Sequence, residues 1–221
     1  MSLFYEIFIA PVKGFGRIKE KPTWVQAVVP LVVLFALLII LDFAFRWITF
    51  PQMMLLALKD GYGFTPQEVL ADPDLASLLV PDTGMIVSGV WNSVVMLFLG
   101  LLLQSALFHF IIVKDNKLLP GTIAVVAWSK FPLIIAWILK ILVGGLLHKP
   151  AVNFSPAMLM SEGSKLAPGL GVLDIFSIWT LILTALGLSV LTEKQKLSAI
   201  TVFGLWVAWF LFMLIKGLAF G

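Results

Sequence analysis

Five long apolar segments, separated by polar or proline-rich connections, dominate the pattern of the chain. Each is long enough to cross a bilayer as a helix, which takes about 20 residues. Because backbone polar groups in lipid must be satisfied within the segment, we predict an all-α polytopic membrane protein with five transmembrane helices. The predicted spans are Trp24–Phe50, Gly84–Val113, Leu119–Leu147, Gly171–Leu191 and Leu197–Phe220.

The first 22 residues alternate large apolar and basic side chains and end at Pro22. This pattern predicts a short interfacial helix, interrupted at Pro11, whose cations face anionic headgroups. A mobile tail that merely holds positive charge is the alternative. We therefore divide the chain into an N-terminal amphipathic segment, residues 1–22, and a five-span membrane domain, residues 23–221.

A long polar connection, from Pro51 to Pro81, follows the first span. Within it, Thr65, Pro66 and Glu68 match an N-cap, a first-turn proline and a capping-box acid, so a short helix should begin there.

The composition supports a membrane protein and excludes several functions. Only 12% of the 221 residues are charged and 61% are hydrophobic, whereas soluble domains have about 25% charged residues. The net charge of +3 comes from basic residues near segment ends, so we expect no nucleic-acid partner. The chain has no cysteine, which excludes disulfides and thiolate metal sites.

The basic residues also predict the orientation. With the N-terminus in the cytoplasm, the inside segments carry eight basic residues and the outside connections three, which fits the positive-inside rule and puts the C-terminus outside. The inside set is Lys13, Arg17, Lys19, Lys21, Lys114, Lys117, Lys194 and Lys196, and the outside set is Lys59, Lys149 and Lys165.

Lys130 lies near the middle of the third span. A lysine at the centre of a membrane helix costs about 2.5–3.5 kcal/mol, so Lys130 should face other helices rather than lipid. No acidic residue is predicted at its depth. Its side chain has three possible environments: carbonyls freed by Pro132, the amide of Gln104, or a water-filled cavity.

Four other charges are predicted at similar depth in the outer half of the membrane: Asp42, Arg46, Lys140 and Asp174. We expect a neutral intramembrane network in which Lys140 pairs with Asp174 and Asp42 pairs with Arg46.

Small and polar residues at helical spacing predict a helix-packing seam. Its members are Gly100, Gln104, Gly187, Gly204 and Ala208. Gly204 and Ala208 suit a second copy of the chain as well as a neighbouring helix.

Catalytic motifs are not visible. His109 and His148 are the only histidines, and the sequence contains no H-E-x-x-H or G-x-S-x-G motif. We expect His109 to have a packing or capping role. The sequence therefore predicts a protein without catalytic residues, metal or cofactor.

Several segments resemble one family. Pro11, Phe15 and Pro22 precede the first span, and AVVAWSKFPLII and IWTLILTALGLSVLTEKQKLSAI lie in the later spans. Within the last stretch, Trp179, Gly187, Leu188, Lys196 and Ala199 stand at the family's characteristic positions. On these residues the chain is similar to the Ypt-interacting-protein (Yip) domain family.

The resemblance implies five spans and a role in organising membranes. Eukaryotic members bind prenylated Rab GTPases and use acidic-aromatic motifs in a long N-terminal region. The corresponding 22 residues here carry no such motif, and the compact form is similar to prokaryotic members. No functional residue is therefore carried over from the family.

We expect a scaffold or adaptor in the plasma membrane of a prokaryote. Its partners would be membrane lipids, other membrane proteins and further copies of itself. The alternative is an ion- or proton-coupled transporter or channel that uses Lys130 and the four outer charges. The absence of internal repeats and of broken helices argues against transport.

Overall fold

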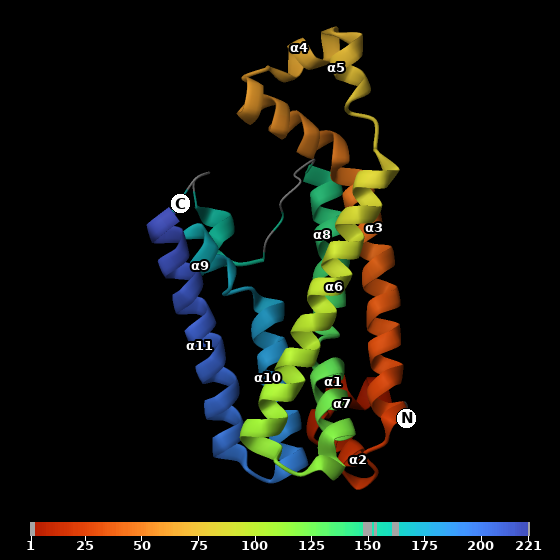
Figure 1. The fold of residues 1–221 in the computed structure, drawn as a ribbon, viewed down its shortest axis with the longest axis vertical. Helices are drawn as coiled ribbons and strands as arrows, with labels where there is room; N and C mark the ends of the chain where they lie inside the picture. Colours follow the sequence, from red (N-terminus) through yellow and green to blue (C-terminus); the bar gives the residue numbers. More distant parts are fainter. Residues whose placement is uncertain (1–2, 148–151, 153, 161–163, 221) are drawn as a thin grey trace. The chain divides into compact units, whose positions relative to one another are not determined.

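The computed structural model describes residues 3–147, 152, 154–160 and 164–220. These residues form helices and no strand, and 5 helical segments are long and apolar enough to cross a membrane. The predicted all-α, five-span architecture is confirmed. The spans are α3 (Trp24–Tyr62), α6 (Thr83–Phe108) with a π-turn (His109–Val113), α7 (Leu119–Ser129) with α8 (Pro132–Leu147), α10 (Ile175–Thr192) and α11 (Gln195–Phe220) (Figure 1).

The remaining elements are short. They are α1 (Leu3–Ile9), α2 (Pro11–Glu20), α4 (Pro66–Ala71), α5 (Pro73–Ser77), α9 (Ala167–Gly171) and two 3₁₀ turns, Asn116–Leu118 and Pro156–Leu159. The chain divides into two compact units, and the division passes through α3, α6 and α8. Unit 1 comprises Met1–Ala36, Met96–Ala136 and Asn153–Gly221, and unit 2 comprises Leu37–Val95 and Trp137–Val152.

In unit 1 the N-terminal helices pack against α7 and α10 (Figure 1). The chain breaks between α1 and α2 at Ala10, beside the proline that predicts the interruption. Ile7, Phe15 and Ile18 are at most 1% exposed, so this segment contributes side chains to the core of unit 1. Gly14 permits the close approach of α1 to α2, because a Cβ there would lie 2.7 Å from Ile7 Cγ1.

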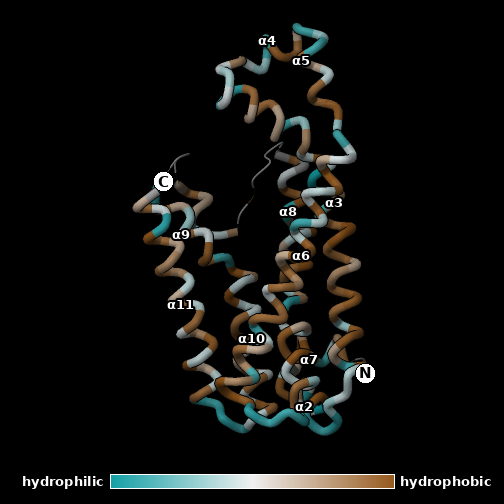
Figure 2. The backbone as a smooth tube through the Cα atoms, viewed as in Figure 1, coloured by the Kyte–Doolittle hydropathy of each residue, from teal (hydrophilic) through white to brown (hydrophobic). Residues whose placement is uncertain are grey.

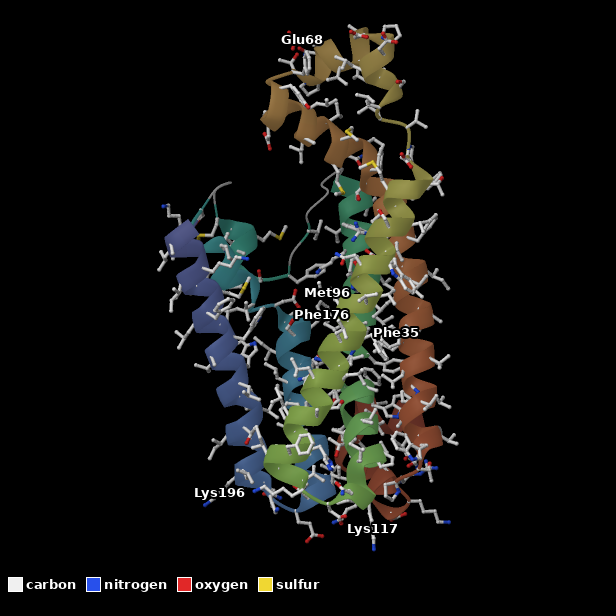
Figure 3. All side chains as sticks on the ribbon, viewed as in Figure 1. Phe35, Glu68, Met96, Lys117, Phe176 and Lys196 are labelled. Carbon is white, nitrogen blue, oxygen red and sulfur yellow. The ribbon has the colours of Figure 1, made fainter. Side chains whose placement is uncertain are left out.

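The polar turns of unit 1 meet at one end (Figure 2). Lys19, at the end of α2, forms an ion pair with Glu193 between α10 and α11. The neighbouring Lys194 Nζ donates a hydrogen bond to the Ile112 carbonyl, 3.3 Å away, in the π-turn after α6. Lys117 and Lys196 project from this same end (Figure 3). The three segments predicted to share one side of the membrane thus lie together.

At the other end of unit 1, α9 lies beside the last turns of α11 (Figure 1). The contact is close because it is made through glycines: a Cβ at Gly169 would lie 2.9 Å from Leu214 Cδ1, and one at Gly217 would lie 3.1 Å from Pro168 Cγ. The sequence predicted no helix at this position.

Unit 2 has a small core around Phe50, Ile86 and Val90, packed by Met54 and Val94. The predicted short helix is present as α4, and its capping box is complete. Thr65 Oγ1 accepts a hydrogen bond from Glu68 N at 3.3 Å, and the Glu68 carboxylate accepts one from Thr65 N at 2.7 Å.

The structure corrects three predicted boundaries. The first helix does not end at Phe50 but continues through Pro51 to Tyr62, because Gln52–Leu58 consists of strong helix formers that outweigh one proline. The third span is not continuous, since it breaks between Ser129 and Pro132. The fourth helix begins at Ile175 rather than Gly171. His148 and Lys149 lie outside the described residues.

Candidate functional site: a cavity around Lys130

The break in the third span places Lys130 between two helices. Ser129 ends α7, Pro132 begins α8, and the backbone N–H of Lys130 and of Phe131 donate to the carbonyls of Ala127 (3.1 Å) and Trp128 (3.3 Å). A proline at residue 132 explains the break, since it supplies no N–H and disfavours helical geometry before it. The predicted absence of broken helices is therefore wrong.

An aromatic cluster supports the break. The ring of Phe131 stacks on that of Trp128, with centroids 5.0 Å apart, and Phe4 of α1 meets the Phe131 ring edge-on at 5.4 Å. Phe8 makes a second edge-on contact with Trp179 of α10, at 5.7 Å. The N-terminal segment thus packs directly against the turn that presents Lys130.

Lys130 is half-buried and lines a cavity of about 900 Å³ within unit 1. The walls come from α6, the start of α8, α9, α10, α11 and the Lys130 turn, and they are mainly aliphatic and aromatic. Gln104 lines the same cavity, which therefore contains two of the predicted site residues. In the part of the chain that the structure describes, Lys130 Nζ has no ion pair and no hydrogen-bond partner.

Two further lining residues carry unpartnered donors. Thr180 is 3% exposed, and neither its Oγ1 nor Trp206 Nε1 has a hydrogen-bond partner among the described residues. A buried polar group without a partner costs about 1–3 kcal/mol. Sequence reasoning missed both residues. The only signal in the sequence is that each residue lies at helical spacing from other residues on one face of its helix. That spacing is equally consistent with packing and with binding.

The Asp42–Arg46 pair of unit 2 is present and has a third member. Arg46 Nε donates to Asp42 Oδ2 at 3.1 Å, and Arg46 Nη2 donates to Ser93 Oγ on α6, also at 3.1 Å. Gly89 lies one turn away from Ser93, and a Cβ there would lie 2.5 Å from Arg46 Nη1. The absence of a side chain at Gly89 therefore makes room for the guanidinium.

The other proposed pair lies in different units. Lys140 Nζ, in unit 2, lies 5.6 Å from the centroid of the Trp137 ring, within cation–π range. Asp174, in unit 1, is the N-cap of α10, and its Oδ1 accepts hydrogen bonds from Phe176 N (2.9 Å) and Ser177 N (3.2 Å). Its buried Oδ2 has no partner among the described residues. The pairing of Lys140 with Asp174 stays a prediction.

The predicted seam divides into buried and open positions. Gly187 is buried, and a Cβ there would lie 2.5 Å from Val125 and 3.1 Å from Phe15. Gly100 lines the cavity, and no heavy atom lies within 4 Å of the Cβ position at Gly100 or at Gly204. Ala208 is exposed. Within the described residues, Gly100 and Gly204 therefore make no close contact of the kind made by Gly187, and the seam at Gly100, Gly204 and Ala208 stays a prediction.

His109 begins the π-turn and is buried, with Nε2 3.4 Å from Asn116 Oδ1. Its Nδ1 has no partner within the described chain. The described residues also contain no group of three or more histidine, cysteine, aspartate or glutamate side chains placed to hold a metal ion. Lys130, Thr180 and Trp206 form the candidate ligand site, because they line one cavity and their polar groups have no partner within the described chain.

Comparison with known proteins identifies a family relationship. A family model described as the Yip1 domain matches residues 5–217, which is nearly the whole chain. No curated protein and no solved structure matches the chain.

Proposed function

The chain belongs to the Yip1 domain family, and on that premise we propose that it is a non-catalytic membrane scaffold or adaptor that binds lipids or other membrane proteins. The observation that carries this proposal is the cavity of unit 1, which combines apolar walls with a half-buried cation that has no partner in the described part of the chain. Apolar pockets with a few placed polar groups are typical of binding sites.

We further propose that the protein resides in a prokaryotic plasma membrane with its N-terminus in the cytoplasm and its C-terminus outside. The contacts of Lys19 with Glu193 and of Lys194 with Ile112 support this orientation, because they join three segments rich in cations. Such segments favour the cytoplasmic side.

The natural absence of cysteine makes the orientation simple to test. Single cysteines at Asn116 and Asp72 are reacted in intact cells with a maleimide that does not cross membranes. We expect labelling of Asp72→Cys and protection of Asn116→Cys until the cells are permeabilised. The opposite pattern would reverse the orientation.

Transport is the second candidate function. The break at Lys130 and Phe131 favours it, because interrupted helices often bind ions or substrates in transporters. In this alternative, Lys130 and the charges at Asp42, Arg46, Lys140 and Asp174 form the ion or proton pathway.

Liposomes that contain the purified protein separate the two functions. A scaffold should produce no proton or ion flux above that of empty vesicles, with the same membrane potential imposed on both. A flux that Lys130→Met abolishes and Lys59→Met leaves unchanged would establish transport. Lipids and proteins retained during purification from native membranes, identified by mass spectrometry, then give the scaffold's partners.

A further inference from the structure

The cavity of unit 1 presents hydrogen-bond donors and a positive charge, and no acid among the described residues lines it. Among its lining residues that the structure describes, Lys130 is the only charged one. Trp206 Nε1 can only donate a hydrogen bond, and the Thr180 hydroxyl can also donate one. In surroundings of low dielectric, an ammonium group is stabilised by a nearby negative charge. The complementary ligand group is therefore an oxyanion.

Most of the remaining wall is apolar and suits a hydrocarbon chain, with Gln104 and Ser177 as its other polar residues. One face of α11 lines the cavity over five positions: Val202, Leu205, Trp206, Trp209 and Met213. At 1.5 Å per residue, this face extends about 16 Å along the helix. The volume of about 900 Å³ lies in the upper part of the range for small-molecule sites, about 300–1,000 Å³.

Lys130 has a defined place relative to this apolar face. It stands in the turn between α7 and α8, where the backbone hydrogen bonds already satisfy the carbonyls of Ala127 and Trp128. Lys130 Nζ donates to no carbonyl of the described chain, so the ammonium does not compensate the proline break. Stacking of Phe131 on Trp128 holds the turn in place, and Lys130 remains available to a ligand.

We propose that this cavity binds an amphipathic anion, whose carboxylate or phosphate head meets Lys130 and whose hydrocarbon tail lies along α11. This assignment rests on the proposed lipid-binding function and specifies its ligand class. A fatty acid and an anionic phospholipid share the required chemistry.

Brominated lipids give a direct test, because bromine quenches tryptophan fluorescence at short range and Trp206 and Trp209 line the cavity. The full-length protein in neutral detergent is titrated with 9,10-dibromostearate and with its uncharged methyl ester. We expect the acid to bind at least about tenfold more tightly than the ester, because only the acid pairs with Lys130. This comparison requires no variant.

Two lysine variants then locate the charge. Lys130→Met should raise the Kd of the acid about tenfold and leave that of the ester unchanged, whereas Lys140→Met should change neither. Lys130→Arg should retain the preference for the acid. Thr180→Val should weaken acid binding by a smaller factor. Each variant is checked for monodispersity and for its thermal unfolding midpoint before titration.

The headgroup source follows from a second probe, dibrominated phosphatidylglycerol, with dibrominated phosphatidylcholine as its zwitterionic control. Preference for either anionic probe over its control, lost in Lys130→Met, supports the proposal and identifies the head as carboxylate or phosphodiester. Equal binding of charged and uncharged probes by the wild type would overturn it, as would equal losses in Lys130→Met and Lys140→Met. The proposed scaffold function has a separate test, because it would be contradicted by ion or proton flux in liposomes.

Discussion

Each unit contains an intramembrane cation, and the two cations differ in whether the chain supplies a partner for them. In unit 2 the Arg46 guanidinium contacts the Asp42 carboxylate and the Ser93 hydroxyl, both at 3.1 Å, and Gly89 leaves space for it. In unit 1 Lys130 borders a cavity and has no partner among the described residues. A charge satisfied within the chain depends on its partner for a stable fold, whereas an unsatisfied charge beside a cavity is available to a ligand.

The largest expected effect comes from breaking the satisfied pair. Asp42→Asn should destabilise the protein by about 3 kcal/mol, because it leaves the Arg46 charge without its counter-ion in a partly buried site. Reversible unfolding in detergent, followed by circular dichroism, measures the change. Lys130→Met is the matched comparison and should be neutral or stabilising. A similar loss in both variants would contradict the distinction between the two cations.

Crowding the guanidinium should have the next largest effect. Gly89→Leu places side-chain atoms where Arg46 Nη1 now lies and should cost about 1–3 kcal/mol, as overpacking usually does. Gly100→Leu is the control, because no heavy atom lies within 4 Å of the Cβ position there. The same unfolding assay applies, and equal losses at the two glycines would show that the room at Gly89 is unimportant.

The predicted pairing of Lys140 with Asp174 can be tested without disturbing the helix cap. Asparagine caps a helix about as well as aspartate, so Asp174→Asn removes the charge and keeps the hydrogen bonds to Phe176 and Ser177. Combined with Lys140→Met, the double-mutant cycle should give a coupling of about 0.5–3 kcal/mol if the two charges interact. Additive losses would reject the pair.

The ion pair at the polar end of unit 1 should have the smallest effect. The hydrogen bond and the charge of Lys19 hold the pKa of Glu193 below its ordinary value of 4.5. A lowered pKa in the folded state means that this contribution is complete above about pH 4.5 and is lost as the pH falls through the lower, folded-state value.

Thermal unfolding at pH 7 and pH 4 checks this sign. Glu193→Gln should lower the midpoint slightly at pH 7 and reduce the loss on acidification, with Glu20→Gln as the exposed control. If the wild-type midpoint falls no further between pH 7 and pH 4 than the midpoint of Glu193→Gln, the ion pair does not stabilise the protein.

Much of the fold could be predicted from the sequence because it depends on local patterns. Three features follow from residues that are neighbours in the chain, and all three are present. They are the apolar spans, the capping box of Thr65 and Glu68, and the interruption beside Pro11. The effect of a proline on a helix is harder to predict from the sequence. Pro51 lies inside a continuous helix, whereas Pro132 begins a new one after a break. Surrounding helix propensity and tertiary packing decide between these outcomes.

The candidate site was only partly predictable, because its contacts join distant segments. The sequence identified Lys130 and Gln104 as unusual residues, and both line the cavity. It did not identify Trp206 or Thr180, since an aromatic residue or threonine at helical spacing is equally consistent with packing. Nor could it pair Arg46 with Ser93, which lie 47 residues apart.

An experimental structure in nanodiscs made from native lipids would test the central claim most directly. The account predicts elongated density along the α11 face from Val202 to Met213, with its head within hydrogen-bonding distance of Lys130 Nζ. A Lys130 ammonium paired with a carboxylate of the protein itself, in a cavity filled by the protein's own side chains, would contradict it.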